Sequence, residues 1–324
     1  MRTENTVPEP DDAIVVESVE KSFGTVKALR GISITVPAGT VMGVLGPNGA
    51  GKTTTVSVLS TLVRPDAGRA LVAGYDVVRQ PTEVRASIML TGQYAALDEV
   101  LTGRENLVLF GRLLGLHRKQ AKVRADELLE QFALAEAADR RVGQYSGGMR
   151  RRIDIACGLV RPPRVVFLDE PTTGLDPVSR QSLWALVREL KRQGVTVLLT
   201  TQYLEEADAL SDNIIVVDQG AVIAEGTADQ LKARSGSSYC EVVPADPADV
   251  PRLVTALAGL GEVTVPDSAD RVALPAPGGA ATLTEALHRI TGSGIELIDI
   301  ALRRPSLDEV FIELTKPAAV ESPA

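Results

Sequence analysis

One stretch of this chain combines glycines, a lysine and a threonine at a spacing that suits the binding of nucleotide phosphates. It has the pattern G-x-x-x-x-G-K-T and runs from Gly46 to Thr53. Glycines let backbone N–H groups turn inward around an anion. Lys52 can reach the β- and γ-phosphates, and the Thr53 hydroxyl can be offered to Mg²⁺. The predicted chemistry is binding of a nucleoside triphosphate by the loop residues Gly46, Pro47, Asn48, Gly49, Ala50, Gly51, Lys52, Thr53 and Thr54.

The segments on either side of this loop fit that chemistry. Residues 41–45 are an apolar run that predicts a strand, and residues 54–59 have the composition of a helix. Glycine-rich turns are common in proteins, so the loop by itself would be a weak signal. The order strand, glycine loop, helix makes it specific, because the N-terminus of the helix also favours an anion.

Two carboxylates and two glutamines stand at the ends of further strand-like runs. Asp169 and Glu170 end an apolar run of the kind that predicts a buried strand in a parallel sheet. Such sheets bind ligands at the carboxyl ends of their strands. Gln93 and Gln202 end two other runs. Phe23 lies before the phosphate loop, where an aromatic ring could stack on adenine or equally belong to the core.

Composition limits the class of protein. The chain has 324 residues, with 34 Lys and Arg against 42 Asp and Glu, and its net charge is −8. This balance argues against a nucleic-acid binder, so we expect no nucleic acid partner. The arginines at 150–152 could contact nucleic acid or anionic lipid, but a solvated helix face is the preferred interpretation. Cys157 and Cys240 are far apart and are expected to be buried free thiols.

No apolar run approaches the ~18–20 residues that span a bilayer. The acidic start of the chain also has no apolar core of a signal peptide. We therefore expect a cytoplasmic protein that reaches a membrane only through a partner.

The pattern of elements predicts an α/β domain with a helical subdomain, followed by a small α+β domain. Residues 13–233 would form the first domain, with helical periodicity over about 94–160. Residues 234–316 would form an accessory domain, and 1–12 and 317–324 would be loose tails. The order β-α-β-β-α-β in the accessory domain matches the ferredoxin-like plait. Its strands are expected at 238–243, 262–265, 271–274 and 295–302.

Five motifs in a fixed order resemble the ATP-binding subunit of ABC transporters, over about residues 13–226. They are the phosphate loop, Gln93, Ser146-Gly147-Gly148, Asp169-Glu170 and Gly174-Leu175-Asp176. A Ser-Gly-Gly signature shortly before a strand that ends in acids is highly specific. The resemblance implies a P-loop NTPase fold with an ABC-type nucleotide-binding domain, and ATP and Mg²⁺ as its ligands.

Three further stretches narrow the resemblance to the daunorubicin-resistance type of exporter ATPase. They are residues 145–149, 200–208 and 306–311, and this similarity covers nearly the whole chain. The resemblance implies separate ABC-2-type integral membrane permease subunits as partners. It also implies a place at the cytoplasmic face of the cell membrane. The cargo would be an anthracycline-like drug such as daunorubicin or doxorubicin, or a complex lipid such as phthiocerol dimycocerosate.

The resemblance also assigns roles to single residues. Asp169 would orient Mg²⁺ through water, and Glu170 would act as general base on the attacking water. Gln93 would contact the metal and the γ-phosphate and sense the membrane partner. Phe23 would be the adenine stacker, in place of the commoner tyrosine.

A second group of residues would act on a second copy of the chain. Ser146, Gly147 and Gly148 would bind the γ-phosphate held on the other copy's loop, so that two ATP molecules join a head-to-tail dimer. Asp176 would lie at the same interface.

Gln202 departs from most ABC ATPases, which have histidine there. Glutamine can donate a hydrogen bond to the γ-phosphate or to Glu170, but it cannot take up a proton near neutral pH. An inactive site is less favoured than slow hydrolysis, because Glu170 and the whole signature remain.

Other functions stay open at this point. One is a soluble ABC ATPase of DNA repair or translation, although those usually carry a coiled-coil insertion or tandem nucleotide domains. Another is an ATP sensor without catalysis, and a third is an importer subunit. The accessory domain could be a dimerisation or stability module, or a regulatory ligand site, because this plait hosts many functions.

Overall fold

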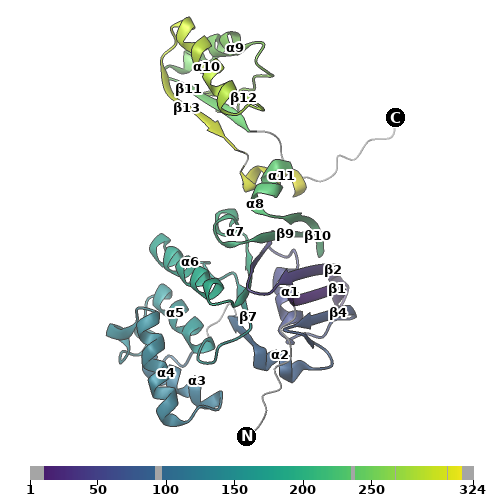
Figure 1. The fold of residues 1–324 in the computed structure, drawn as a ribbon, viewed down its shortest axis with the longest axis vertical. Coiled ribbons are helices and arrows are strands. Elements are labelled where there is room, and N and C mark those ends of the chain that lie inside the picture. The colour runs from purple at the N-terminus through teal and green to yellow at the C-terminus, as the bar shows by residue number, and fades with distance from the viewer. Residues whose placement is uncertain (1–10, 92–96, 235–237, 267, 305, 316–324) are drawn as a thin grey trace. The chain divides into compact units, whose positions relative to one another are not determined.

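The computed structural model describes residues 11–91, 97–234, 238–266, 268–304 and 306–315. Contacts within it divide the chain into two units, Met1–Ala228 and Asp229–Ala324. Each unit has a hydrophobic core of its own, and Figure 1 shows the elements that build them.

The central sheet of the first unit has six strands in the order β10-β9-β3-β8-β7-β6. Strands β9, β3, β8, β7 and β6 are parallel, and β10 pairs antiparallel with β9. Strands β3 (Val41–Leu45), β7 (Val165–Asp169) and β8 (Thr196–Thr201) are buried along their whole length. They are the apolar runs that predict central strands. The other members are β6 (Ile88–Thr91), β9 (Asn213–Asp218) and β10 (Ala221–Gly226).

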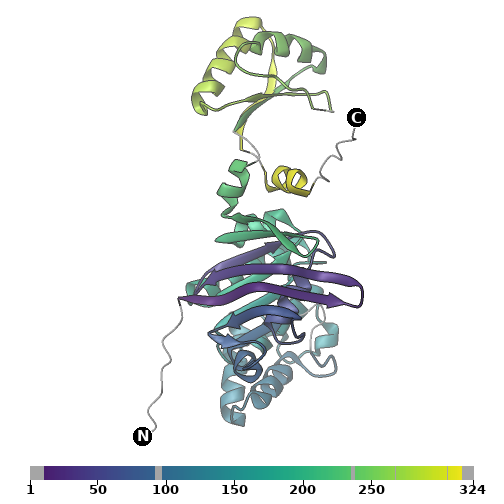
Figure 2. The ribbon, with the colours of Figure 1, turned by 90° about the vertical axis from the view of Figure 1, so that its right-hand side faces the viewer.

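A second sheet of four antiparallel strands, in the order β2-β1-β4-β5, packs over helix α1 (Lys52–Leu59). This helix contacts β7 of the central sheet and also β2 and β4, so it lies between the two sheets. Val56 of α1 shares its core with Ile34 and Phe167. Figure 2 shows the long hairpin of this sheet in purple. The strands are β1 (Asp12–Phe23), β2 (Val26–Pro37), β4 (Ala67–Val72) and β5 (Tyr75–Asp76).

Helices α3 to α7 lie on the other side of the central sheet, with α3, α4 and α5 at the lower left of Figure 1. Buried side chains from three of them, Leu107, Leu128 and Trp184, belong to one core. A reciprocal pair of hydrogen bonds between Thr102 and Glu105 caps the first helix of the group. These helices are α3 (Gly103–Leu113), α4 (Arg118–Gln131), α5 (Gly147–Gly158), α6 (Pro177–Arg192) and α7 (Leu204–Leu210). Helix α2 (Pro81–Ser87) instead places Val84 in the core that α1 shares. Short 3₁₀ helices span Ala135–Ala137 and Val142–Gln144.

The second unit holds a three-stranded antiparallel sheet in the order β12-β11-β13. Cys240 and Val242 of β11 pack with Leu253 and Ile290 from its helices. Cys240 and Cys157 are both buried free thiols, as predicted. The elements are α8 (Ala228–Arg234), β11 (Tyr239–Pro244), a 3₁₀ helix (Pro247–Asp249), α9 (Val250–Leu257), β12 (Val272–Pro275), α10 (Ala280–Ser293), β13 (Leu297–Arg303) and α11 (Leu307–Thr315).

The strand predicted at 262–265 is wrong. Only Thr264 pairs there, as an isolated antiparallel bridge to Ala273. Pro266 follows two residues later and has no N–H to continue a ladder. The strand order is that of the ferredoxin-like plait with this edge strand reduced to one bridge.

A buried carboxyl stands out among the polar groups of the first unit. Glu206 of α7 has no exposed surface, and its Oε1 accepts a hydrogen bond from Trp184 Nε1 at 3.2 Å. Its Oε2 has no hydrogen-bond partner among the described residues. Burial raises the pKa of Glu206, and the neighbouring hydroxyls of Thr201 and Thr172, the Trp184 N–H and the charge of Arg180 oppose this only in part. An ionised Glu206 therefore costs stability.

Replacing this carboxyl by an amide should stabilise the protein more at about pH 8 than at about pH 5. The neutral carboxyl favours the folded state below its ordinary pKa of 4.5, and that contribution is lost as the pH rises through the raised pKa. Glu206→Gln cannot ionise, and its carbonyl can still accept from Trp184. Melting temperatures measured by calorimetry at both pH values check this. Glu205→Gln is the control, because that neighbouring side chain is 75% exposed. The idea is wrong if both variants show the same pH dependence.

Candidate ATP-binding site

The phosphate loop is held closely against the central sheet between β3 and α1. Gly49 and Gly51 have φ angles of +81° and +109°, which side chains with a Cβ rarely adopt. A Cβ on Gly46 would lie 2.3 Å from the carbonyl oxygen of Val217 on β9. The glycines of the sequence pattern are therefore needed for the backbone path.

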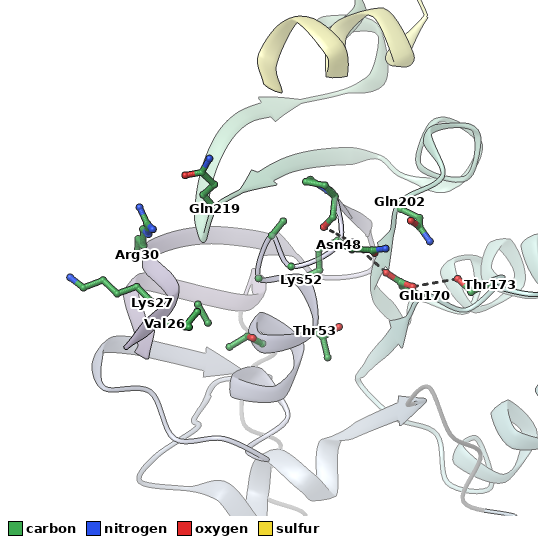
Figure 3. A pocket seen from close by; sticks show the side chains of 16 residues that line it. Val26, Lys27, Arg30, Asn48, Lys52, Thr53, Glu170, Thr173, Gln202 and Gln219 are labelled. Atoms are coloured by element: carbon green, nitrogen blue, oxygen red, sulfur yellow. Dashed lines mark hydrogen bonds and ion pairs between the residues drawn. The ribbon is translucent and has the colours of Figure 1, made fainter. Parts of the chain in front are cut away.

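Lys52, the first residue of α1, points to the centre of the site (Figure 3). Its side chain is 4% exposed, and Nζ donates to the carbonyls of Gly46 at 2.8 Å and Pro47 at 3.1 Å. The same Nζ lies 3.3 Å from Glu170 Oε1. The lysine thus connects the loop to the predicted general base.

The two carboxylates at the end of β7 are held by a threonine of the neighbouring strand β8. Thr200 Oγ1 donates to Asp169 Oδ1 at 2.5 Å and accepts from the backbone N–H of Glu170 at 3.0 Å. Thr53 Oγ1 lies 3.3 Å from the same Asp169 oxygen. Glu170 has φ +45°, a strained value for a residue with a side chain. Its Oε2 accepts from Thr173 Oγ1 at 3.4 Å.

The phosphate loop from Pro47 to Thr54, together with Glu170 and Thr173, lines a cavity of about 720 Å³. Its volume lies within the range of about 300–1,000 Å³ that small-molecule sites have. Of the predicted site residues, Pro47 to Thr54, Glu170 and Gln202 line it. The sequence did not single out the other lining residues, which are Val26, Lys27, Ala28, Arg30, Thr173 and Gln219.

The donor atoms present suit a nucleotide with Mg²⁺. The loop offers a glycine cradle with a buried cation at its base, as phosphates need. Thr53 Oγ1 and Asp169 Oδ1 are hard oxygen donors of the kind Mg²⁺ prefers, and this ion usually takes few protein ligands beside substrate phosphates. Within the described residues no group of three or more His, Cys, Asp or Glu side chains could hold a metal by itself.

The Ser146 corner, meaning residues Ser146 to Gly148, does not line this cavity. Ser146 caps α5, and its Oγ accepts from the backbone N–H of Met149 at 3.3 Å. A Cβ on Gly148 would lie 2.2 Å from Ser179 Oγ on α6. The N-termini of α5 and α6 therefore meet closely.

Asp176 caps α6 at that meeting point. Its carboxylate accepts from Ser179 Oγ at 2.6 Å and from the backbone N–H of Ser179 at 2.9 Å. These hydrogen bonds lower the pKa of Asp176, so it stays ionised. The structure places Asp176 beside the Ser146 corner and not in the cavity.

Gly46, Asp169 and Phe23 do not line the cavity either. Gln93 lies outside the described residues. The Phe23 side chain is half exposed, and Lys21 Nζ lies 5.5 Å from the centre of its ring. Phe23 pairs with Val26 across the hairpin, and Val26 does line the cavity. Stacking of Phe23 on adenine stays a prediction.

Thr200 is a further residue beside the site that the sequence pattern did not single out. It is fully buried in β8, and only the pairing of β7 with β8 brings it beside Asp169. A polar residue at the end of an apolar strand was the available signal. The same signal points to Gln202, two residues further on, whereas the pattern predicts Thr200 only as part of the strand.

The chain is similar to known ATP-binding proteins of ABC transporters. A family model described as ABC transporter matches residues 29–173. The doxorubicin resistance ATP-binding protein DrrA of Mycobacterium tuberculosis is 60% identical over 94% of both chains. The daunorubicin resistance ATP-binding protein DrrA2 of Streptomyces coeruleorubidus is 56% identical over 94% of this chain and 95% of its own length.

Solved structures agree with these relatives. A dimeric ATP-binding cassette in a post-hydrolysis state, bound to ADP and phosphate, is 25% identical with a TM-score of 0.61. The match covers 66% of this chain and 98% of that structure. The predicted P-loop ABC fold is thereby confirmed. None of the helices described here is long and apolar enough to cross a membrane.

Removing the Thr200 hydroxyl should impair catalysis without impairing ATP binding. In Thr200→Val, Asp169 loses a donor and the backbone N–H of Glu170 keeps only the Thr200 carbonyl as acceptor, at 3.1 Å, whereas the phosphate loop is untouched. We expect kcat for ATP hydrolysis to fall by about 10- to 100-fold, the cost of misplacing a reacting group. Steady-state phosphate release and the Kd for ATP check this.

Thr196→Val is the matched control, at the other end of the same strand. Thr196 is equally buried, and its Oγ1 accepts from the backbone N–H of Gly39 at 2.9 Å. Each variant should cost about 1 kcal/mol of stability for its lost hydrogen bonding. A similar kcat in both variants would show that Thr200 has no special role.

Proposed function

This chain belongs to the ATP-binding proteins of ABC transporters and is an ATPase, and on that premise we propose how its site works. Two copies would bind two ATP molecules, each held between the phosphate loop of one copy and the Ser146 corner of the other. Hydrolysis would drive export of a hydrophobic or amphipathic compound through separate membrane subunits. The chain would sit at the cytoplasmic face of the membrane through those subunits.

One observation carries the shared site. The cavity has a phosphate loop, a lysine and a general base, but the Ser146 corner and Asp176 lie apart from it in the same chain. The open N-terminus of α5 favours an anion. Gly147 has no other atom near its missing Cβ, so a ligand could approach there. The dimeric cassette among the solved structures is consistent with a second copy completing the site.

Each residue then has a stated task. Lys52 exchanges its contacts with the loop carbonyls and Glu170 for phosphate oxygens. Glu170, released from the lysine, accepts a hydrogen bond from water and acts as its general base. Water adds to the γ-phosphorus as the bond to ADP breaks, and inorganic phosphate leaves. Bound Mg²⁺ would neutralise phosphate charge, and Thr53 and Asp169 are the side chains that would hold it.

Gln202 limits the rate in this proposal. It lines the cavity with Glu170, so its amide is in place to donate to the γ-phosphate or to the general base. It cannot take up a proton near neutral pH. Slow Mg²⁺-dependent hydrolysis is therefore expected, faster with the membrane subunits present.

The proposals for the cargo and for the class of partner are based on similarity to the relatives. Two of them are named for resistance to doxorubicin and daunorubicin, which favours an anthracycline-like compound. A complex lipid such as phthiocerol dimycocerosate fits the same chemistry. ABC-2-type permease subunits are the proposed partners, and residues 234–316 are proposed as a dimerisation or stability module.

Glu170→Gln should trap ATP in a stable dimer, because binding remains and the general base is lost. Phosphate release should fall by roughly 100-fold or more. Size-exclusion chromatography with light scattering should show a larger share of dimer in Mg-ATP than without nucleotide. A pure sensor would show no change in either measurement.

A second substitution tests the shared site itself. Ser146→Arg in the Glu170→Gln background should abolish the dimer, because it fills the corner that would face the partner's γ-phosphate. ATP affinity of the single chain should stay within about twofold, since the phosphate loop is untouched. Retention of the dimer would contradict the head-to-tail arrangement.

The export proposal is tested with the membrane subunits. Polypeptides with several membrane spans encoded beside this gene should co-purify with the chain and stimulate its ATPase activity. An anthracycline-like cargo predicts drug accumulation in cells that lack the chain. An envelope-lipid profile unchanged on deletion would exclude the lipid cargo.

A further inference from the structure

The prediction that the arginine run at 150–152 forms a solvated helix face is wrong. All three side chains donate to other segments of the chain. Arg150 Nη2 donates to the carbonyl of Gly143 at 2.8 Å, and Arg152 Nη1 to that of Phe132 at 3.0 Å. Both of these contacts stay within the helices and loops around α5.

Arg151 differs from its neighbours in what it joins. Its Nε donates to the carbonyl of Pro171 at 3.1 Å, and its Nη2 donates to Thr91 Oγ1 at 3.1 Å. Pro171 directly follows Glu170, and Thr91 is the last residue of β6. One side chain of α5 therefore holds the ends of two strands of the central sheet.

We infer that Arg151 is a positioning residue for ATP hydrolysis, which fixes the Ser146 corner of α5 to the backbone that carries Glu170. The inference rests on the proposed shared site. Ser146 caps the helix and Arg151 lies within its first turns, so a rigid helix links the two. Glu170 serves the cavity of its own chain, whereas the Ser146 corner serves the cavity of the other copy. Arg151 would therefore keep the two half-sites of one chain in a constant relation.

Other contacts of α5 support the inference that this helix is held in a fixed position. A Cβ on Gly148 would meet Ser179 of α6 at 2.2 Å, and one on Gly158 would meet Met89 of β6 at 2.4 Å. The helix is thus closely packed at both ends, and the guanidinium of Arg151 adds a polar contact near the first of them. Small shifts of α5 would be transmitted because such packing leaves no free space.

The charge of Arg151 is balanced inside the protein. Its side chain is 13% exposed, and Nη1 lies 3.5 Å from Asp154 Oδ2, one helical turn on. Burial lowers the pKa of Arg151, and Asp154, Asp169 and Glu206 oppose this. The guanidinium stays protonated and offers three coplanar donor nitrogens, of which Nε and Nη2 make the contacts with Pro171 and Thr91. A lysine would keep the charge but would offer one nitrogen in place of three.

Arg151→Lys tests the inference in the full-length protein. We expect the Kd for ATP and the KM to stay within about twofold, and kcat to fall by about 10- to 100-fold, as for a misplaced reacting group. In the Glu170→Gln background the same change should weaken the ATP-dependent dimer. A purely structural role would lower the melting temperature but leave kcat per folded molecule unchanged.

Arg152→Lys is the matched control, because it makes the same change one residue along the helix. It should keep wild-type kcat. Thr91→Val removes the Thr91 contact of Arg151 but leaves the contact with the Pro171 carbonyl, so it should lower kcat less than Arg151→Lys does. Combined with Arg151→Lys it should add little further loss of kcat, because both changes break the same contact between Arg151 and Thr91.

Wild-type kcat in Arg151→Lys, an equal loss in Arg152→Lys, or fully additive losses with Thr91→Val would each overturn the inference. The proposed shared site fails separately, through the Glu170→Gln and Ser146→Arg variants. A sound ATP-dependent dimer together with an unaffected Arg151→Lys variant would reject the positioning role alone.

Discussion

Strands β3, β7 and β8 run in parallel, and their register sets the distances within the site. Leu45 of β3 pairs with Thr201 of β8, and Asp169 of β7 pairs with Thr200. The phosphate loop, the carboxylates and Gln202 all begin where these strands end. A shift in the pairing of β7 with β8 would separate Asp169 from Thr200 Oγ1. Because these strands are buried throughout, the pairing cannot change without disturbing both cores.

That burial also explains how strongly the polar groups are held. Thr200 has no exposed surface, so its hydroxyl must find partners in the protein, and it finds them on Asp169 and Glu170. Glu170 is held at a positive φ next to a buried lysine. Strain of this kind persists only where surrounding structure over-determines the residue. Glu206 is the opposite case, because one of its oxygens lacks a described partner and the stability depends on its protonation.

In the proposed dimer the ATP-binding site of one chain is divided between two faces of its first unit. The cavity lies at the ends of the central strands, whereas the Ser146 corner and Asp176 lie at the N-termini of α5 and α6. Contacts between α5 and the strands must then preserve a relation that no single ligand enforces. Close glycine packing provides part of that contact, and the Arg151 guanidinium provides a directional part.

The sequence alone determined the phosphate loop, the acid-ended strand, the Ser-Gly-Gly corner and most element boundaries, because each depends on local spacing and periodicity. Only the tertiary structure decided the contacts between residues that are distant in the chain. Thr200 and Asp169 are 31 residues apart, and Arg151 and Thr91 are 60 apart. The arginine run was predicted to be solvated because a helical pattern does not show which backbone carbonyls lie within reach of its side chains. The strand predicted at 262–265 is wrong for a related reason. A short edge strand depends on hydrogen bonds to its neighbour, and Pro266 has no N–H to continue them.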